Sequence, residues 1–335
     1  MQTLSEVDSL HAAPQLSVVI PCYNEQEGMA ELHKRVTAVC RDAVGDSYEF
    51  VLINDGSSDS TWSVMRAQAA LDPHLVCVNL SRNHGHQLAL SAGLQVCRGM
   101  RVLVLDADLQ DPPELLPRMM KMMDDGCDVV YGQRTKRQGE TVFKRATAAL
   151  FYRLLDQLVD IDIAVDSGDF RLISRRAVDC LNQMPEHDRF IRGMVSWIGL
   201  RQEPIQYERA ARFAGVTKYP FSKMLQLALD AVTGFSIRPL RIASYLGILC
   251  GIGGLLQLIH VFWAWYSNET VQGWTSLMAV VLVIGSAQLL VAGVMGEYLG
   301  RLYIESKGRP LYIIQDIIRS SPERSTIEVK TAQRA

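Results

Sequence analysis

Short apolar runs alternate with helix-like segments over the first two-thirds of the chain. Each apolar run has the length of one strand and ends at polar or turn-forming residues. Strands are expected at 16–20, 50–53, 75–80, 101–105, 128–131 and 170–174. Helices are expected at 27–40, from 60 or 61, at 86–96, from 112, at 145–158 and at 189–198. The alternation predicts a mostly parallel sheet with helices on both faces, and hence an α/β fold.

Two long uncharged runs follow in the last third of the chain. Residues 242–265 and 274–296 contain no Asp, Glu, Lys or Arg. A helix needs about 20 apolar residues to cross a bilayer, so we place transmembrane helices at about 242–265 and 274–299. The alternative is a pair of buried helices in a soluble protein. Neighbouring uncharged runs of this length are rare in soluble cores, which favours the membrane interpretation.

The distribution of basic residues predicts the topology. Arg238 and Arg241 precede the first run, and further basic residues follow the second, whereas 266–273 has no Lys or Arg. The positive-inside rule therefore places both termini and the α/β domain in the cytoplasm. Residues 1–15 lack the pattern of a signal peptide. We expect a multi-pass protein of the inner (cytoplasmic) membrane.

The expected organisation has five parts. They are a polar N-terminal tail (1–15), an α/β domain (16–218), interfacial amphipathic helices (219–239), two transmembrane helices (240–300) and a cytoplasmic C-terminal tail (301–335). The amphipathic segment suits the membrane surface, with an ordinary core helix as the alternative.

Charge and cysteine content exclude some classes of function. The 335 residues have a net charge of −2, so no general basic field indicates nucleic-acid binding. The seven cysteines are scattered without C-x-x-C spacing, which favours reduced thiols in a cytosolic domain.

Polar residues follow three of the expected strands. Asn24-Glu25, Asp55 and Asp106-Ala107-Asp108 all fall at strand ends. Parallel α/β sheets bind ligands at the carboxyl ends of their strands, so one pocket can collect these side chains. Two carboxylates there can hold a hard divalent cation that also contacts a diphosphate. The alternative for Asp106 and Asp108 is a role in helix capping and turns.

The segment 54–61 adds a second polar motif. Asp55 can accept a hydrogen bond from a pyrimidine N–H, and Gly56 permits a tight turn. An ordinary strand-to-helix turn would account for the same residues.

Basic residues form three groups along the chain. These are Arg134, Lys136, Arg137, Lys144 and Arg145; then Arg189 and Arg192; then Arg209, Arg212 and Lys218. Arginine suits two-point contacts with phosphate, which favours anion binding. For the first group, the alternative is a solvated loop or a patch facing anionic lipids.

Several motifs together resemble a known family. They are 18–25 (VVIPCYNE), 55–61 (DGSSDST), 81–85 (SRNHG), 106–112 (DADLQDP), 168–172 (GDFRL), 217–219 (TKY) and 296–301 (GEYLGR). From Leu16 to about Tyr312, the chain resembles family 2 glycosyltransferases with a GT-A fold. It is most similar to the polyprenyl-phosphate branch, and within that branch to the bactoprenol glucosyltransferases.

The resemblance implies roles for individual residues. Pro21, Tyr23, Glu25 and Asp55 would line the nucleoside pocket. Asp106 would contact the donor, Asp108 would bind Mg²⁺ or Mn²⁺, Gln110 would face the reacting centre, and Asp169 would be a further acidic residue of the catalytic site, near that centre. Arg209, Arg212 and Lys218 would close over the diphosphate and acceptor. We add four more phosphate-binding candidates: Arg134, Arg137, Lys144 and Arg145.

Two of these motifs leave alternatives open. Asp169 would orient the acceptor or a sugar hydroxyl, or else pair with Arg171 or another arginine. His84-Gly85-His86 departs from the family's commoner aromatic-Gly-basic pattern. We expect its imidazoles to point to solvent or phosphate rather than to bind a metal.

The implied activity is inverting, metal-dependent transfer of a hexose, glucose from UDP-glucose, to undecaprenyl or another polyprenyl phosphate. A phosphomonoester has a second pKa near 6, so this acceptor needs little help from a base. Alternative donors are GDP-mannose, a UDP-amino sugar and UDP-GlcNAc, and a non-catalytic membrane scaffold is a rival. Two spans and the absence of a Q-x-x-R-W motif argue against a processive synthase. Expected partners are the donor, the lipid acceptor, the membrane, a flippase and a downstream glycosyltransferase, and the spans would suit a homo-oligomer.

Overall fold

The computed structural model describes residues 13–135, 167–208, 238–267 and 273–319. These residues fall into two compact units. An α/β unit contains 13–135, 167–208 and 310–319, and a helical hairpin contains 238–267 and 273–309.

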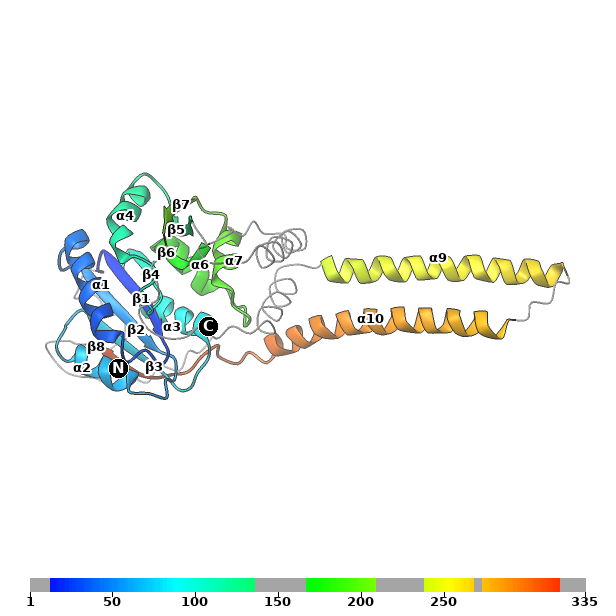
Figure 1. Cartoon of the computed structure of the whole chain (residues 1–335), viewed down its shortest axis with the longest axis horizontal. Helices are drawn as coiled ribbons and strands as arrows, with labels where there is room; N and C mark the ends of the chain where they lie inside the picture. The colour runs from blue at the N-terminus through cyan, green and yellow to red at the C-terminus, as the bar shows by residue number, and fades with distance from the viewer. Residues whose placement is uncertain (1–12, 136–166, 209–237, 268–272, 320–335) are drawn as a thin grey trace, which may run out of the picture. The chain divides into compact units, whose positions relative to one another are not determined.

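The α/β unit is built on an eight-stranded sheet of order β7-β5-β6-β4-β1-β2-β3-β8 (Figure 1). Its strands are β1 (Leu16–Cys22), β2 (Tyr48–Asn54), β3 (Leu75–Leu80), β4 (Arg101–Val104), β5 (Val129–Arg134), β6 (Ser167–Ser174), β7 (Gln202–Tyr207) and β8 (Ile314–Arg319). The central strands β4, β1, β2 and β3 are parallel, as are β5 and β7. β6 and β8 run antiparallel to their neighbours.

Helices cover both faces of this sheet. They are α1 (Met29–Val44), α2 (Thr61–Ala69), α3 (His86–Val96), the 3₁₀ turn η2 (Pro113–Leu115), α4 (Leu116–Asp124), α6 (Arg175–Gln183) and α7 (Ile191–Ile198). Helix α1 contacts both α2 and α4, and α6 contacts both α3 and α7, so the helices form two connected sets (Figure 1).

The central strands are apolar on both sides because helices bury both. Val18, Ile20 and Leu52 belong to one core cluster with α1 residues such as Leu32. On the α3 side, a Cβ at Gly93 would stand 2.4 Å from Cγ1 of Val19, so only glycine lets α3 pack this closely. Fully buried parallel strands of this kind read as continuous apolar runs.

The structure confirms the expected α/β fold. The strand at 75–80 and the helix at 86–96 have the expected bounds, and the other expected strands are present with ends shifted by a few residues. The helices expected at 145–158 and within 219–239 lie outside the described residues. The helix start at 60–61 is present, but its capping contact comes from Asp59, whose Oδ1 accepts the Thr61 N–H at 2.9 Å.

Three elements were not expected: α6, β7 and β8. β8 corrects the expected C-terminal tail at 301–335, because residues 314–319 pair with β3 inside the sheet. The physical reason is the open edge of β3, whose backbone groups need hydrogen-bond partners.

The hairpin unit consists of α9 (Arg238–Tyr266) and α10 (Trp274–Ser306). Segments Pro239–His260 and Val280–Ser306 are each long and apolar enough to cross a membrane, with mean hydropathy 1.9. Large apolar side chains such as Leu249 (67% exposed) and Leu289 (76% exposed) point outward from the hairpin. Such surfaces fit the interior of a bilayer.

Candidate active site

The loops after β1 and β2 are held together by hydrogen bonds. Asn24, whose φ of 55° is left-handed, donates its N–H to Oγ of Ser57 at 3.0 Å and accepts the Ser58 N–H on Oδ1 at 2.9 Å. Glu25 donates its N–H to Oγ1 of Thr61 at 2.9 Å. Because the two strands are parallel neighbours, their polar ends form one continuous rim.

Asp55 extends this rim to the loop after β3. Its carboxylate accepts the N–H groups of His84 at 2.7 Å and Gly85 at 3.0 Å. Asp55 is 3% exposed, and burial raises its pKa against the lowering effect of these two hydrogen bonds. Asp55 therefore anchors the loop that leads into α3.

The expected nucleoside-binding residues share this part of the sheet edge. Pro21 is buried inside β1, and Tyr23 is 48% exposed just beyond the strand. Glu25 is half-buried, and Asp55 is buried. An aromatic face beside polar groups suits a base-binding pocket, and their role in nucleotide binding stays a prediction.

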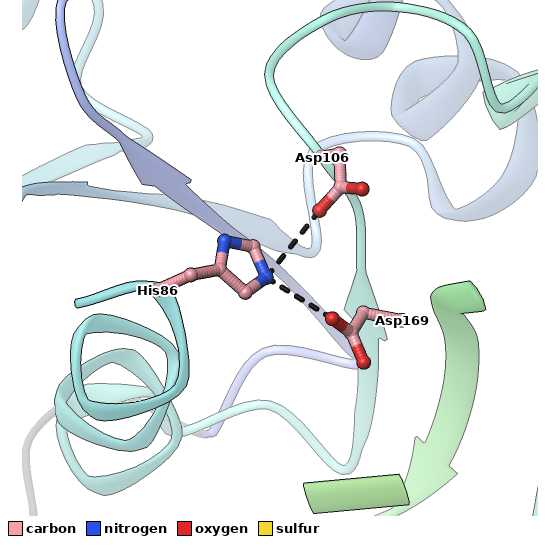
Figure 2. A group of neighbouring side chains, drawn as sticks. All are labelled: His86, Asp106 and Asp169. Carbon is pink, nitrogen blue, oxygen red and sulfur yellow. Dashed lines mark hydrogen bonds and ion pairs between the residues drawn. The ribbon is translucent and has the colours of Figure 1, made fainter. Parts of the chain in front are cut away.

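Asp106 lies two residues beyond the end of β4. Its Oδ1 is buried and has no hydrogen-bond partner among the described residues. The imidazole of His86 lies close by, with its Nε2 3.5 Å from this oxygen (Figure 2). Burial raises the pKa of Asp106 to about 6, with the neighbouring charge of His86 acting in the opposite direction.

Asp169 approaches Asp106 from β6. The antiparallel pairing of β6 with β4 sets Arg171 opposite Val104, so Asp169 lies just past the end of β4. The residue is 5% exposed. Burial alone would raise its pKa, but the charge of Arg192 and the hydrogen bond from His86 hold the pKa well below its usual value.

His86 joins the two carboxylates. Its Nε2 lies 3.2 Å from Oδ2 of Asp169 as well as 3.5 Å from Oδ1 of Asp106 (Figure 2). Burial opposes its protonation, but the hydrogen bond to Asp169 and the charge of Asp106 outweigh it and raise the pKa. The His86 side chain is 40% exposed, so it borders solvent as expected, and it also contacts these two carboxylates, which was not expected.

These three side chains can hold a metal ion. Their ligand atoms lie within 4.8 Å of one another. Asp108, the expected metal ligand, is not in this group; its Oδ1 accepts the Gln110 N–H at 3.2 Å in the turn around Leu109, whose φ is 56°. The roles of Asp108 and Gln110 stay predictions.

Arg134 occupies a neighbouring ion-pair network. Its Nε donates to the Tyr207 hydroxyl at 3.2 Å, and its guanidinium lies 3.8 Å from Oδ1 of Asp111. Tyr207 also donates to that carboxylate oxygen at 2.5 Å. Arg134 is thus held beside the Asp106–Asp111 loop, and its role in phosphate binding stays a prediction. The other phosphate-binding candidates, Arg137, Lys144, Arg145, Arg209, Arg212 and Lys218, lie outside the described residues.

Two contributors were not identified from the sequence. Gln87 donates to Oδ2 of Asp169 at 3.1 Å, and Tyr207 links Asp111 to Arg134. Gln87 follows His86 at the start of a helix after a parallel strand, and that location was the signal available. Asp169 pairs with an arginine, as one alternative expected, and this arginine is Arg192, with Nε 2.9 Å from Oδ1. The role of Asp169 towards a substrate stays a prediction.

Comparison with known proteins shows to which family the chain belongs. A family model described as Glycosyl transferase family 2 matches residues 17–181, and one described as GtrB C-terminal hairpin matches 238–302. The uncharacterized glycosyltransferase YkcC of Bacillus subtilis (strain 168) is 46% identical over 302 residues, covering 90% of this chain and 93% of that protein. The SfII prophage-derived bactoprenol glucosyl transferase of Shigella flexneri is 37% identical, covering 92% and 100%. The bactoprenol glucosyl transferase of Shigella phage SfV is 38% identical, covering 90% and 98%.

These similarities extend over both units of the chain. The α/β unit is a GT-A domain. The acidic cluster lies at the carboxyl end of the central strand β4, and α/β sheets of this kind bind ligands at the carboxyl ends of their strands. The chain is a glycosyltransferase, and it belongs to the family 2 glycosyltransferases.

Proposed function

We propose that this enzyme transfers glucose from UDP-glucose to undecaprenyl phosphate or another polyprenyl phosphate at the cytoplasmic face of the membrane. The observation that carries this proposal is the match to bactoprenol glucosyl transferases over at least 90% of the chain at 37–38% identity. The match includes the apolar hairpin, which would keep the catalytic domain beside a lipid acceptor.

The acidic cluster supports a divalent cation, Mg²⁺ or Mn²⁺, as cofactor. The buried and unpartnered Oδ1 of Asp106 is a suitable ligand for a hard cation. Asp106 would hold the ion, with His86 and Asp169 as further candidate ligands from the same cluster. Asp108 is a candidate ligand through the family resemblance alone. When bound, the ion would neutralise negative charge that develops on the departing nucleotide.

The proposed reaction is a single displacement that inverts the anomeric centre. A phosphate oxygen of the acceptor forms the new bond to the anomeric carbon while the bond to the nucleoside diphosphate breaks. The acceptor is already ionised near neutral pH, so the enzyme's main tasks are to hold two anionic substrates together and to stabilise the leaving group. The cationic side chains of Arg192, which pairs with Asp169, and of Arg134, which lies beside Asp111, suit those tasks.

The test is a transfer assay with the purified full chain in detergent. Short-chain polyprenyl phosphate is offered with UDP-glucose, GDP-mannose, UDP-GlcNAc or a UDP-amino sugar, and nucleotide release and glycolipid are measured. We expect the highest kcat/KM with UDP-glucose, loss of turnover with a chelator, and recovery with Mn²⁺ or Mg²⁺. Analysis of the product by nuclear magnetic resonance should show the β-anomer. Absence of transfer from all four donors would reject the proposal, and preference for another donor would replace UDP-glucose.

The membrane setting suggests further partners. A lipid-linked sugar made on the cytoplasmic side would need a flippase and a second glycosyltransferase to reach a cell-envelope glycan. The exposed apolar faces of α9 and α10 are also compatible with a homo-oligomer.

A further inference from the structure

Both carboxylate oxygens of Asp169 are bonded by neighbouring side chains. Nε and one terminal nitrogen of Arg192 lie 2.9 Å from Oδ1 and 3.4 Å from Oδ2. His86 and Gln87 contact Oδ2 at 3.2 Å and 3.1 Å. Three of these contacts fall on Oδ2 and one, from Arg192, falls on Oδ1. Donors on both oxygens stabilise the ionised carboxylate, which makes Asp169 a weak proton acceptor.

The ion pair between Asp169 and Arg192 is asymmetric. The side chain of Asp169 is 5% exposed, whereas that of Arg192 is 35% exposed. The carboxylate is therefore the buried member of the pair, and the guanidinium is the member that reaches solvent. A guanidinium has five N–H donors, and a carboxylate that grips one edge orients the rest of the group.

Gln87 fixes the helix that carries Arg192. Its Nε2 donates to Asp169, and its Oε1 accepts the N–H of Ile191, the first residue of α7, at 2.9 Å. One amide thus links α3, β6 and α7 directly beside Arg192. This arrangement defines the position of an arginine more strictly than an isolated surface ion pair would.

We propose, on the basis of the proposed function above, that Arg192 binds a phosphate group of a substrate and that Asp169 and Gln87 are positioning residues that hold it. The phosphate belongs either to the donor diphosphate or to the lipid acceptor. Both are anions that must approach the acidic cluster, and Arg192 offers a held, partly exposed cation next to it.

The test measures KM for each substrate and kcat in variants of the full chain. Arg192→Ala should raise KM for the substrate whose phosphate it binds by about ten- to one-hundredfold, the range expected for lost hydrogen bonds to a charged group. Arg192→Lys should recover part of this loss, because it keeps the charge but not the planar fork. A rise confined to UDP-glucose identifies the donor diphosphate, and a rise confined to polyprenyl phosphate identifies the acceptor.

Asp169→Asn separates a positioning residue from a proton acceptor. We expect it to raise the same KM as Arg192→Ala, and the double variant to be no more than about twofold worse than Arg192→Ala alone, because both changes remove one interaction. A proton acceptor would behave differently: Asp169→Asn would lower kcat at saturating substrates and alter its pH profile, while Arg192→Ala would leave kcat intact. That pattern, or an unchanged KM for both substrates in Arg192→Ala, would overturn the proposal.

Arg176→Ala is the matched control. Arg176 also makes a two-point ion pair with a largely buried aspartate, Asp128. This pair lies at the opposite end of the strands, where β4 begins. The KM values of Arg176→Ala should equal those of the wild type. Thermal melts report whether each variant folds. If Asp169→Asn does not fold, the KM values of the two Arg192 variants alone test the proposal. If the wild type itself shows no turnover, the proposed function fails, and calorimetric binding of UDP and of short-chain polyprenyl phosphate then tests Arg192→Ala directly.

Discussion

Asp106 is the residue on which the proposed chemistry most depends, because its buried Oδ1 has no hydrogen-bond partner within the described structure. Asp106→Asn removes the charge while keeping the shape. We expect kcat to fall by at least about a hundredfold, since electrostatic stabilisation of a leaving group is worth several kcal/mol. Titration calorimetry should also show loss of Mn²⁺ binding. As a control, Asp179→Asn removes an exposed carboxylate that pairs with Arg175 in its own helix, and this variant should match the wild type.

The raised pKa of Asp106 predicts a pH-dependent metal affinity. With a pKa of about 6, this carboxyl is ionised at pH 7 and mostly protonated at pH 5. Protons then compete with the cation, so Mn²⁺ should bind roughly tenfold more weakly at pH 5 than at pH 7. The raised pKa of His86 acts in the same direction, because its imidazolium occupies Asp106 and Asp169. Calorimetry at pH 5, 6 and 7 tests this, and an affinity that is constant over the range would contradict it.

The same raised pKa of Asp106 makes the folding stability fall as the pH rises, whereas the metal affinity rises with pH. Its folded pKa lies above its usual value of 3.8, so the folded state holds a proton that the unfolded chain releases. The resulting stabilisation is complete below about pH 4 and is lost as the pH rises through 6. In the metal-free protein, Asp106→Asn should therefore raise the melting temperature at pH 7 more than at pH 4. An equal shift at both pH values would indicate that burial of this charge costs little.

Single residues also show the limit of prediction from sequence. The D-x-D motif located Asp106 at a strand end, because an apolar run followed by carboxylates is a local pattern. The direction of the His86 ring was not predictable, because it depends on Asp169, a residue 83 positions away in the chain. The contacts of Gln87 with Asp169 and Ile191 depend in the same way on distant segments.

At the scale of elements, the loops after β2 and β3 meet through Gly56. Its φ is +62°, and a Cβ there would stand 2.4 Å from backbone atoms of Arg82 and Asn83. Gly45 has nearly the same φ, +61°, with nothing within 4 Å, and so provides a matched control. Gly45→Ala should cost about 1–3 kcal/mol from backbone strain alone, because its ψ of −132° lies outside the left-handed helical region. Gly56→Ala should cost at least about 2 kcal/mol more and weaken UDP binding; equal losses of stability on chemical denaturation would show that the loops separate easily.

Strand β8 closes the edge of β3. Besides the sheet pairing, Ser81 donates its N–H to the carbonyl of Ile313 at 2.9 Å, and the buried Tyr312 hydroxyl donates to Gln95 of α3. A chain that ends at residue 309 would expose an edge strand, so we expect a lower melting temperature and aggregation in size-exclusion chromatography. A chain that ends at 319 keeps β8 and should behave as the full chain does. Equal behaviour of the two truncated chains would contradict a structural role for β8.

The elements that sequence reasoning missed share a physical cause. Strands β1 to β4 are apolar because helices cover them on both faces, and such runs are visible locally. β7 (QEPIQY) and β8 (IQDIIR) contain polar residues because they are the outermost strands of the sheet. Their strand structure is specified by pairing with β5 and β3, which are distant in sequence.

At the scale of the whole molecule, a GT-A domain and an apolar hairpin occur in one chain. The two apolar helices were predictable because charge-free apolar runs of more than 20 residues are rare outside membrane spans. The orientation of the hairpin in the membrane is a separate inference, which rests on the basic residues that flank its helices. Since a lipid phosphate acceptor and a cytoplasmic nucleotide sugar must meet at one membrane face, the proposed function requires both ends of the hairpin on the cytoplasmic side.

Cysteine labelling in intact spheroplasts tests this orientation. Ser267 follows α9 at the loop without Lys or Arg, and Ser306 ends α10 next to basic residues. By the positive-inside rule, a membrane-impermeant maleimide should label Ser267→Cys in intact spheroplasts and Ser306→Cys only after permeabilisation. The unsubstituted chain, whose seven cysteines are free thiols, gives the background. The reverse pattern would put the acidic cluster on the side without nucleotide sugars, and transfer from a cytoplasmic donor would then be untenable.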